Sequence, residues 1–458
     1  MNVKKILLVI SSVAVIISCK VAQPYTQPAG VAGNNLYRGV SATDTNTIAD
    51  ISWKDMFADP LLQALIQEGI NNNLDLKMAV ARIKTAAANA WQSKLALLPS
   101  VDANASASFQ RVPSTQFGFP ETYQLYVNSS WEADIWGKLG SAKRAALAAL
   151  LQSDAYKRAV QTQLVAGIAN NYYLLMAYDA QLQITEQTVA NRREEVETMK
   201  TLKESDVVNG AAVVQSEANL YSAQITVTDL KQSIHETENA ISVLLGRNPD
   251  SIARSTLAQQ AVTTNLATGV PAQLLANRPD VQEAEYQFRG AFEQVNVART
   301  YFYPSLKITA SAGLSGTSIS QLFDLSTFFA NITGSLLQPI FEKGVNKQRL
   351  AVAQATEEEY LADFKKSLLT AGQEVSDALF SYQSAKEKEG LRQQQVSYLQ
   401  KSVDFTKELL KYSSATNYTD VLVSEQNLLS AQLSGISDKL QQLTAVVNLY
   451  SSLGGGWK

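Results

Sequence analysis

The sequence is poor in two residue types that often build metal and catalytic sites, since its 458 residues include one cysteine and one histidine. A single cysteine excludes an intramolecular disulfide and every multi-cysteine metal site. His235 has no other histidine or cysteine near it in the chain, so we interpret it as a solvated helix residue rather than a metal ligand or general base. No glycine-rich phosphate loop stands out, because Gly454-Gly455-Gly456 follows a helical pattern and is typical of a helix end. We therefore expect no catalysis, no cofactor and no bound metal.

The chain also lacks a hydrophobic run long enough for a membrane helix, and it lacks an excess of basic residues. Residues 6–18 are apolar or small and follow Lys4 and Lys5, but they fall short of the roughly 20 residues that cross a bilayer. This pattern predicts a secretory signal over residues 1–18. The formal net charge of −3 argues against a nucleic-acid partner, which would need a basic face.

Cys19 directly follows this signal. Ile16, Ile17 and Ser18 precede it, and aliphatic residues, a small residue and then cysteine resemble the bacterial lipoprotein signal, in which that cysteine is acylated and becomes the mature N-terminus. Lys20, where some lipoproteins carry an aspartate, resembles outer-membrane sorting. We therefore predict lipid attachment at Cys19 and a lipidated tether over residues 19–52, much of it rich in Pro, Thr, Ala, Asn and Gly. The alternative is a chance cysteine after an ordinary signal.

The chain repeats itself. Residues 216–224 read SEANLYSAQ and residues 424–432 read SEQNLLSAQ, a shift of 208. Such a match predicts an internal duplication, with a first repeat over residues 53–260, a second over residues 261–458, and three residues inserted late in the second. Further anchors align at a shift of 205 or, in the last pair, 208: Asn73-Leu74-Asp75 with Arg278-Pro279-Asp280, Leu98-Pro99-Ser100 with Tyr303-Pro304-Ser305, Ile135-Trp136-Gly137-Lys138 with Ile340-Phe341-Glu342-Lys343, Arg144 with Arg349, and Leu245-Gly246 with Leu453-Gly454.

Each repeat predicts a helix, two strands, a very long helix, a turn and a returning helix. The first helix is expected over residues 59–97 and ends before Pro99, which cannot continue it. The strands are expected at about residues 100–111, 121–134, 305–316 and 326–338. Residues 138–204 contain no proline and predict a helix of about 100 Å.

The four strands alternate between apolar and polar residues over about the length that crosses a bilayer. Such strands fit a membrane barrel with lipid outside and water inside, or a water-facing sheet that packs on a helix. Four strands cannot close, so a membrane sheet requires several copies, and three copies give twelve strands with room for a lumen. The predicted apolar faces are Val101, Ala103, Ala105, Ala107 and Phe109; Tyr123, Leu125, Val127 and Trp131; Leu306, Ile308, Ala310, Ala312 and Leu314; and Phe328, Ala330, Ile332 and Leu336.

The long helix of the second repeat carries a heptad pattern, which predicts packing as a coiled coil. The pattern resumes after a gap of eleven residues, which is typical of a stutter that unwinds the supercoil locally. Its residues are Leu361, Phe364, Leu368, Ala371, Val375, Ala378, Tyr382 and Ala385, and then Val396, Leu399, Val403, Thr406 and Leu410.

These segments resemble the TolC-like outer-membrane efflux factors, in the lipoprotein branch that serves resistance-nodulation-division pumps. The resemblance covers essentially the whole mature chain. It rests on WKDMFADPLLQALIQEGINNNLDLKMAVARI from Trp53, WEADIWGK from Trp131, QPIFEKG from Gln338 and ATNYTDVLVSEQNLLSAQ from Ala415.

The resemblance implies a mainly α-helical protein with a membrane β-barrel: a homotrimer whose twelve strands form one barrel, continued by a periplasmic coiled-coil tube. It implies an outer-membrane exit duct that exports small molecules or metal ions with a periplasmic membrane-fusion adaptor and an inner-membrane resistance-nodulation-division pump. The lipid of the outer membrane would hold the anchor. Two alternatives remain at this point, the exit duct of a protein-secretion system and a non-conducting structural coiled-coil lipoprotein.

Asp420 matches the place where family members carry acidic residues after the second periplasmic turn. Three copies around a threefold axis would form a ring of carboxylates, which attracts cations and can gate a pore. The alternative role is to cap the helix that begins there. Family members often have a second acidic residue three positions later, but this chain has Val423, which puts a double acidic ring in doubt.

Overall fold

The computed structural model describes residues 21–28, 36–37, 47–109, 121–261, 266, 268–269, 273–412 and 418–458. The chain divides into two compact units. The first combines Met1–Ala29, Arg82–Asp154 and Glu283–Lys365, and it contains the sheet. The second combines Gly30–Ala81, Ala155–Gln282 and Lys366–Lys458, and it contains the helical hairpins.

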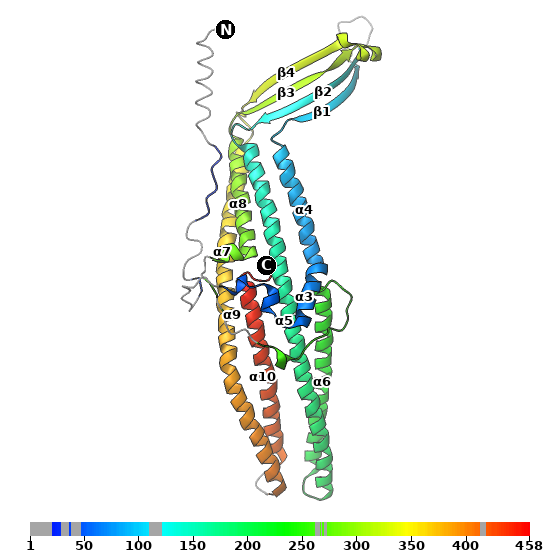
Figure 1. The fold of residues 1–458 in the computed structure, drawn as a ribbon, viewed down its shortest axis with the longest axis vertical. Helices are drawn as coiled ribbons and strands as arrows, with labels where there is room; N and C mark the ends of the chain where they lie inside the picture. Colours follow the sequence, from blue (N-terminus) through cyan, green and yellow to red (C-terminus); the bar gives the residue numbers. More distant parts are fainter. Residues whose placement is uncertain are drawn as a thin grey trace. The chain divides into compact units, whose positions relative to one another are not determined.

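Four antiparallel strands form one sheet in the order β1-β2-β3-β4 (Figure 1). They are β1 (Ser100–Phe109), β2 (Glu121–Ala133), β3 (Ser305–Gly316) and β4 (Phe328–Leu337). The four predicted strands are therefore confirmed: β3 matches its predicted range, and the ends of β2 and β4 differ from the prediction by one or two residues. Residues 110–111, predicted to end the first strand, lie outside the described residues. Two short helices, η4 (Ile319–Phe323) and η5 (Leu325–Thr327), separate β3 from β4.

The register of the sheet places the four predicted apolar faces on one side. Ala103 pairs with Val127, Val127 pairs with Ala312, and Ala312 pairs with Ala330. Directly paired residues of antiparallel strands point to the same face, so the apolar residues form one continuous surface. Its side chains are strongly exposed on the outer strands, with Val101 of β1 67% and Ile332 of β4 79% accessible, and most of those on β3 are half-buried.

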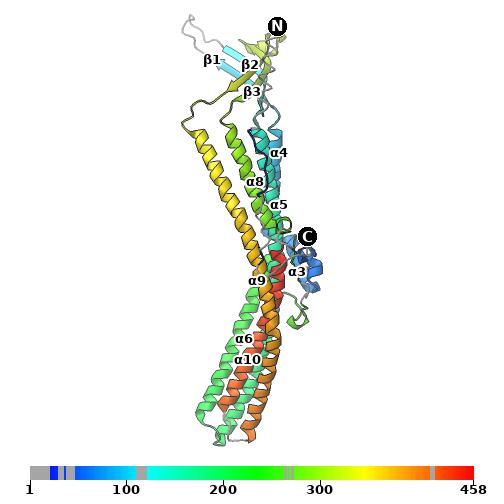
Figure 2. The same ribbon diagram turned by 90° about the vertical axis from the view of Figure 1, so that its left-hand side faces the viewer.

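The helices follow the duplication closely (Figures 1 and 2). The long helix α5 (Lys138–Glu204) matches its predicted range residue for residue, and α9 (Val345–Tyr412) is its counterpart, with 67 and 68 residues. The returning helices α6 (Gly210–Leu244) and α10 (Tyr418–Ser452) each have 35 residues. The short helices α4 (Leu74–Leu95) and α8 (Pro279–Thr300), which precede the strands, each have 22.

The single helix predicted over residues 59–97 is wrong, because the chain forms α3 (Pro60–Asn72) and α4 with a break at Asn73. Asn73 has ψ 133°, which no helix accepts. Its side-chain oxygen accepts a hydrogen bond from the N–H of Leu76 at 2.9 Å, and its amide donates to the carbonyl of Leu244 at 2.9 Å. Asn73 therefore caps α4 and joins it to the end of α6. The remaining short elements are η1 (Ile48–Asp50), α2 (Trp53–Met56), η2 (Leu257–Gln259) and α7 (Leu274–Asn277).

The structure also corrects the place of the inserted residues. Trp131 donates from Nε1 to the carbonyl of Leu97 at 2.9 Å, and Gln338 donates from Nε2 to the carbonyl of Phe302 at 3.2 Å. The two acceptors are 205 residues apart, but the two donors are 207 apart. Two of the three inserted residues therefore lie before this point, within the strand hairpin.

The turns into the long helices agree with this register. Gly137 has φ +79° and Gly344 has φ +85°, again 207 residues apart. The predicted match of Ile135-Trp136-Gly137-Lys138 with Ile340-Phe341-Glu342-Lys343 is therefore out of register by two. The apolar pairs Ile135-Trp136 and Ile340-Phe341 suggested this match. The turn, however, needs a glycine in the left-handed conformation, which aligns Gly137 with Gly344.

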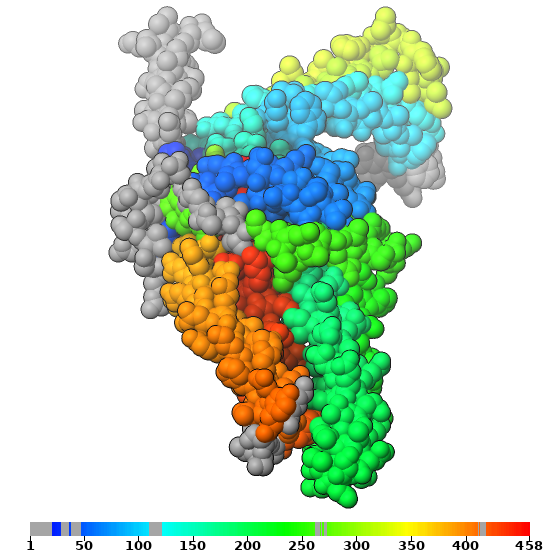
Figure 3. All heavy atoms as spheres, turned by 60° about the horizontal axis from the view of Figure 1, so that its bottom comes forward, coloured from blue at the N-terminus to red at the C-terminus, as the bar shows by residue number. Residues whose placement is uncertain are grey.

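In the second unit the helices pack in the order α6, α5, α10, α9, and Figure 3 shows α10 between α9 and the α5–α6 hairpin. The predicted heptad seam of α9 is confirmed, because its residues from Phe364 to Ala385 are buried. Residues 386–391, inside the predicted gap of eleven, are all exposed. Contacts between neighbouring helices are Lys231 Nζ with Glu186 at 3.2 Å, Asn170 with Asn448 at 3.0 Å, and Arg392 Nε with Asp438 at 2.8 Å.

Candidate functional site

The tip of the first hairpin is the turn between α5 and α6, and residues 209–214, which correspond to the start of α10, carry no charge. Asn209 is the N-cap of α6, and its side chain accepts a hydrogen bond from the N–H of Ala212 at 3.1 Å. Asp206 has φ +57°, a left-handed conformation that aspartate tolerates better than most residues. Val207 at the turn is largely exposed. The turn is therefore rigidly capped and presents an apolar side chain to its surroundings.

The tip of the second hairpin carries Asp420. Helix α10 begins at Tyr418, so Asp420 lies in its first turn and is exposed, rather than at the N-cap position. A carboxylate in the first turn of a helix is stabilised by the positive end of the helix dipole. The corresponding residue of the first repeat is Ala212, which is the third residue of α6 as Asp420 is the third of α10.

A small hydrophobic cluster joins the two hairpins near their tips. Met199 of α5, Val213 of α6 and Tyr418 of α10 are buried in it. The residues packed against these three are Leu202, Val208, Ala212, Leu410 and Leu422. All four helices contribute, so the separation of one hairpin from the other would expose this cluster to water.

Ionisable groups lie next to this cluster, between α5, α9 and α10. Lys407 Nζ lies 2.6 Å from Glu425, and Glu425 shares a hydrogen bond with the carboxyl group of Glu195. Burial raises the pKa of Glu195 to about 8, and the charge of Glu425 adds to this effect. The nearby cations Arg192 and Lys407 lower that pKa again without offsetting the rise. Glu195 is therefore protonated at neutral pH and titrates above it.

Glu195 was not among the residues predicted from the sequence, although a signal for it existed. The residue 208 positions further on is Val403, which belongs to the predicted heptad seam and is buried. A glutamate at a position whose counterpart lies in a coiled-coil seam is a candidate for burial. The comparison of the two repeats position by position would therefore have found it.

Between the tips is a groove with a volume of about 730 Å³. Its lining combines apolar and amide side chains from both hairpins, including Val207, Asn209 and Leu422, with one cation, Arg192. Asp420 is not among the residues that line this groove. An apolar and amide surface that includes an arginine favours contact with another protein segment.

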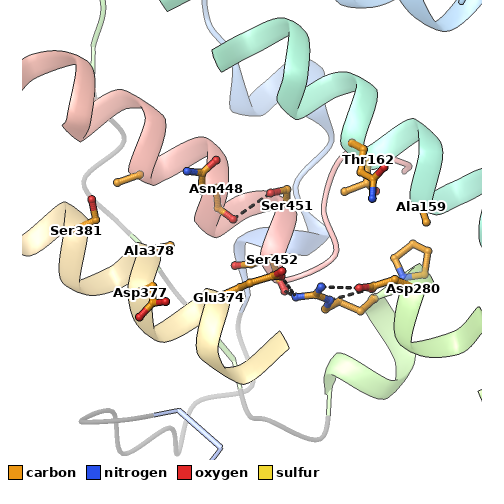
Figure 4. Close-up of a pocket in the computed structure, with 14 residues that line it drawn as sticks. Ala159, Thr162, Asp280, Glu374, Asp377, Ala378, Ser381, Asn448, Ser451 and Ser452 are labelled. Atoms are coloured by element: carbon orange, nitrogen blue, oxygen red, sulfur yellow. Dashed lines mark hydrogen bonds and ion pairs between the residues drawn. The ribbon is translucent and has the colours of Figure 1, made fainter. Parts of the chain in front are cut away.

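A second cavity, of about 540 Å³, lies around Arg278 (Figure 4). Arg278 is buried, and it donates to Asp280 at 2.9 and 2.5 Å, to Glu374 at 2.6 Å and to the carbonyl of Ser452 at 3.0 Å. Figure 4 shows Asp280 and Glu374 on either side of this guanidinium. Because the carboxylates of Asp280 and Glu374 both accept hydrogen bonds from Arg278, the cluster joins α8, α9 and the end of α10 and is not arranged to bind a ligand.

The described residues contain no group of three or more His, Cys, Asp or Glu side chains that could hold a metal ion. His235 lies exposed on α6, as expected. Cys19 falls outside the described residues, so its predicted lipid attachment remains a prediction. Across the helices that the structure describes, none is both long and apolar enough to cross a bilayer.

A duplicated chain with an apolar-faced sheet and two long helical hairpins defines the class of outer-membrane channel subunits. The solved open state of the MtrE outer membrane channel from Neisseria gonorrhoeae has this fold, with a TM-score of 0.86, 25% identity, and coverage of 96% of this chain and 99% of that one. Residues 65–247 and 270–455 match the family described as outer membrane efflux protein, and the chain belongs to this family.

Curated relatives agree with this assignment. The toluene efflux pump outer membrane protein TtgC of Pseudomonas putida is 30% identical, over 96% of this chain and 93% of its own length. The probable outer membrane lipoprotein SilC of Salmonella typhimurium is 26% identical, over 98% of both chains. The protein is therefore an outer-membrane component of an efflux system, and the predicted family, fold class and localisation in the outer membrane are confirmed.

Proposed function

We propose that three copies of this chain form the exit duct of a tripartite efflux pump that exports small molecules or metal ions. A periplasmic adaptor and an inner-membrane resistance-nodulation-division pump would complete the system, and Cys19 would carry the lipid anchor. The duct would have no catalytic role. The observation that carries the proposal is the sheet, whose apolar face is exposed and whose two outer strands each have one neighbour within the described chain.

An open edge in lipid leaves backbone groups without hydrogen bonds, at a cost of several kcal/mol each. Strand β4 of one copy and β1 of the next can pair and so remove both edges. The duplication supports a particular register for this pairing, because β1 corresponds to β3 at a shift of 205 and β2 to β4 at a shift of 207. Within the chain Asn128 pairs with Ser311, so Ser335 of one copy is expected opposite Ser106 of the next.

The helical hairpins support the same arrangement. Leu422, Leu429 and Leu433 of α10 are half-buried and belong to the side of α10 near α5. Their counterparts 208 residues earlier on α6 are Val214, Tyr221 and Ile225, which are 62–66% exposed. Helix α9 has a matching exposed row at heptad spacing: Leu391, Tyr398, Phe405 and Tyr412. The pairing of α5 with α10 inside one chain would thus be repeated as α9 with α6 between chains.

The substrate class follows from the relatives rather than from this chain. TtgC is described as part of a toluene efflux pump, and CusC of Escherichia coli, 26% identical over 96% of both chains, as a cation efflux system protein. The described part of the duct has no metal-binding cluster, which is consistent with passage of the substrate rather than its capture.

Disulfide cross-linking tests the proposed register. A chain with Ser106→Cys and Ser335→Cys should form covalent dimers and trimers on oxidation, because directly opposed residues lie within the 4.4–6.8 Å that a disulfide spans. The matched control combines Ser106→Cys with Thr333→Cys, which is two residues out of register on the same face and should cross-link far less. Equal cross-linking of both pairs, or none of either, would contradict the proposed closure.

A further inference from the structure

The segment that follows the predicted lipidation site lies along helix α8. The N–H of Gln23 donates to Asn296 Oδ1 at 3.0 Å, and Asn296 Nδ2 donates to the carbonyl of Gln23 at 2.9 Å. One side-chain amide therefore satisfies both backbone groups of one residue, as a neighbouring strand would. This contact recognises the backbone of the segment, and the side chain of Gln23 is exposed.

Asn296 belongs to a network of hydrogen-bonded polar side chains. It is fully buried, its Nδ2 also lies 3.3 Å from Glu293, and Glu293 forms a two-pronged ion pair with Arg144 of α5 at 2.6 and 2.9 Å. Buried polar groups destabilise a protein unless they are hydrogen-bonded. The backbone of Gln23 provides the partners that Asn296 needs, so the site is built to receive this segment.

Two further contacts hold the segment in place. The ring of Tyr25 lies edge-on to Phe288 and Phe292, with centroids 5.8 and 5.6 Å apart. A Cβ on Gly137 would lie 3.1 Å from the Cβ of Ala22, so glycine leaves room for the segment at the turn between β2 and α5. These contacts reach α8 and the strand-to-helix turn, which are the parts of the first unit nearest in sequence to the sheet.

We propose that Asn296, Phe288 and Phe292 form a site that binds residues 21–28, which we call the strap. The bound strap would hold the lipid anchor near the start of strand β3 while the sheet enters the membrane. This proposal rests on the acylation of Cys19 proposed above. Cys19 lies four positions before Gln23, so the anchor can lie at most about 14 Å from the clamped residue. Asn296 lies four residues before the end of α8, and β3 begins at Ser305.

At the equivalent position of the first repeat the structure describes no such site, because the residue 205 positions before Asn296 is Trp91, which is 60% exposed. Each chain thus holds one strap, and a trimer holds three. The strap would bring each sheet to the bilayer in a fixed orientation before its edges pair with those of other copies.

The experiment measures how often the strap opens, as the rate at which chymotrypsin cleaves after Tyr25 in the full-length lipidated protein. The variant Asn296→Ala removes the clamp from α8 and leaves the cleavage site unchanged. The variant Gln23→Pro removes the donor N–H from the segment and leaves α8 intact, which guards against a folding defect of the first variant. The matched control is Gln27→Pro, the same change at the exposed glutamine of the second Gln-Pro pair.

In Asn296→Ala and Gln23→Pro we expect the cleavage rate, taken relative to that of a peptide of the same sequence, to rise roughly 30-fold. At 1.4 kcal/mol per tenfold, this rise corresponds to about 2 kcal/mol. The conversion of lipidated chains into trimers in phosphatidylethanolamine–phosphatidylglycerol vesicles should slow about tenfold in both variants, and Gln27→Pro should change neither rate. Unchanged cleavage would overturn the clamp, and normal trimer formation despite faster cleavage would overturn the guiding role. Mass spectrometry of the released peptide reports acylation separately, so an unmodified Cys19 would count against the proposed anchor alone.

Discussion

The two repeats have the same backbone plan but join their helices with different chemistry. In the first repeat Asn73 donates to the carbonyl of Leu244, the last residue of α6, at 2.9 Å. In the second repeat Arg278, 205 positions later, donates to the carbonyl of Ser452, the last residue of α10, at 3.0 Å. The hydrogen bond to the helix end is kept while the donor changes from a neutral amide to a buried cation. Duplication has thus preserved a backbone contact and left the side chain free to vary.

Other equivalent positions differ in the same way. Arg392 and Asp438 form an ion pair between α9 and α10, whereas Ile184 and Leu230 occupy the corresponding positions, 208 earlier, in the first repeat. The buried Glu195 of the first repeat corresponds to Val403. Charged and apolar contacts are therefore exchanged between the repeats, although the lengths of the equivalent helices differ by at most one residue.

The largest effect is expected where the repeats agree. Gly246 and Gly454 end the returning helices with φ +67° and +93°, and a Cβ at either would collide with a backbone carbonyl, that of Asn72 at 2.6 Å and that of Asn277. Gly246→Ala and Gly454→Ala should each cost about 3 kcal/mol or more from strain and overlap, and should reduce the yield of folded trimer more than tenfold. Gel filtration of detergent extracts measures this yield.

Gly344→Ala is the matched control for this prediction. Its φ of +85° is similarly left-handed, but no described atom lies within 4 Å of the added Cβ. We expect a loss of about 1 kcal/mol and nearly normal trimer yield. A yield as low as that of Gly454→Ala would show that the backbone conformation, and not the contact between helix ends, is what both repeats preserve.

The next effect sharpens the difference between the repeats. Arg278→Ala removes hydrogen bonds to Asp280, Glu374 and Ser452 from a buried position, and we expect it to weaken the last turn of α10 by about 2–3 kcal/mol. Asn73→Ala should weaken the end of α6 by only about 1–2 kcal/mol. Hydrogen exchange at the two helix ends measures both losses. Equal losses of protection at the two helix ends would mean that the positive charge of Arg278 adds nothing to the hydrogen bond that both repeats make to the last residue of the returning helix.

The sequence predicted the strands and their faces because lipid exposure acts on every second residue, and it predicted the buried seam of α9 because coiled-coil packing acts on every third and fourth. The range of α5 followed from the lack of proline over residues 138–204. It missed the break at Asn73, since the partner that makes this residue a cap, Leu244, lies 171 positions away. It also aligned the repeats two residues out of register after the strands. Apolar identity guided that alignment, whereas the conformation of Gly137 and Gly344 decides the true one.

The candidate site was predicted in part. Asp420 lies at the start of the second returning helix, as the motif implied, but its proposed role in the pore depends on copies outside one chain. Asn296 was missed because an asparagine in a helix has the same sequence pattern whether it is exposed or buried, and only the packing of a distant segment against it determines its role. Glu195 differs, because its counterpart Val403 in the predicted heptad seam marks its position as a candidate for burial.

The buried Glu195 predicts a pH dependence that the second hairpin, with Val403, lacks. Its pKa is raised to about 8, so the folded state binds a proton that the unfolded state releases near its ordinary value of about 4.3. The stability that this carboxyl contributes is therefore present below about pH 4 and is lost as pH rises through 8. Hydrogen exchange at the start of α10 should show less protection at pH 9 than at pH 6. Glu195→Gln, compared with the parent at each pH, should abolish that difference.

The smallest structural effect, and the one nearest to function, is expected at the tips. Asp420→Ala should change stability by less than about 1 kcal/mol, because the residue is exposed and interactions of exposed charges are weak. If three copies line the pore, the variant should lose cation preference in single-channel recordings of the lipidated trimer in a planar bilayer. Ala212→Asp places the same charge at the equivalent point of the first repeat, and it should strengthen cation preference if both tips face the pore. Unchanged selectivity in Asp420→Ala would reduce Asp420 to a residue that stabilises the start of α10, and the two tips would then differ in helix chemistry alone.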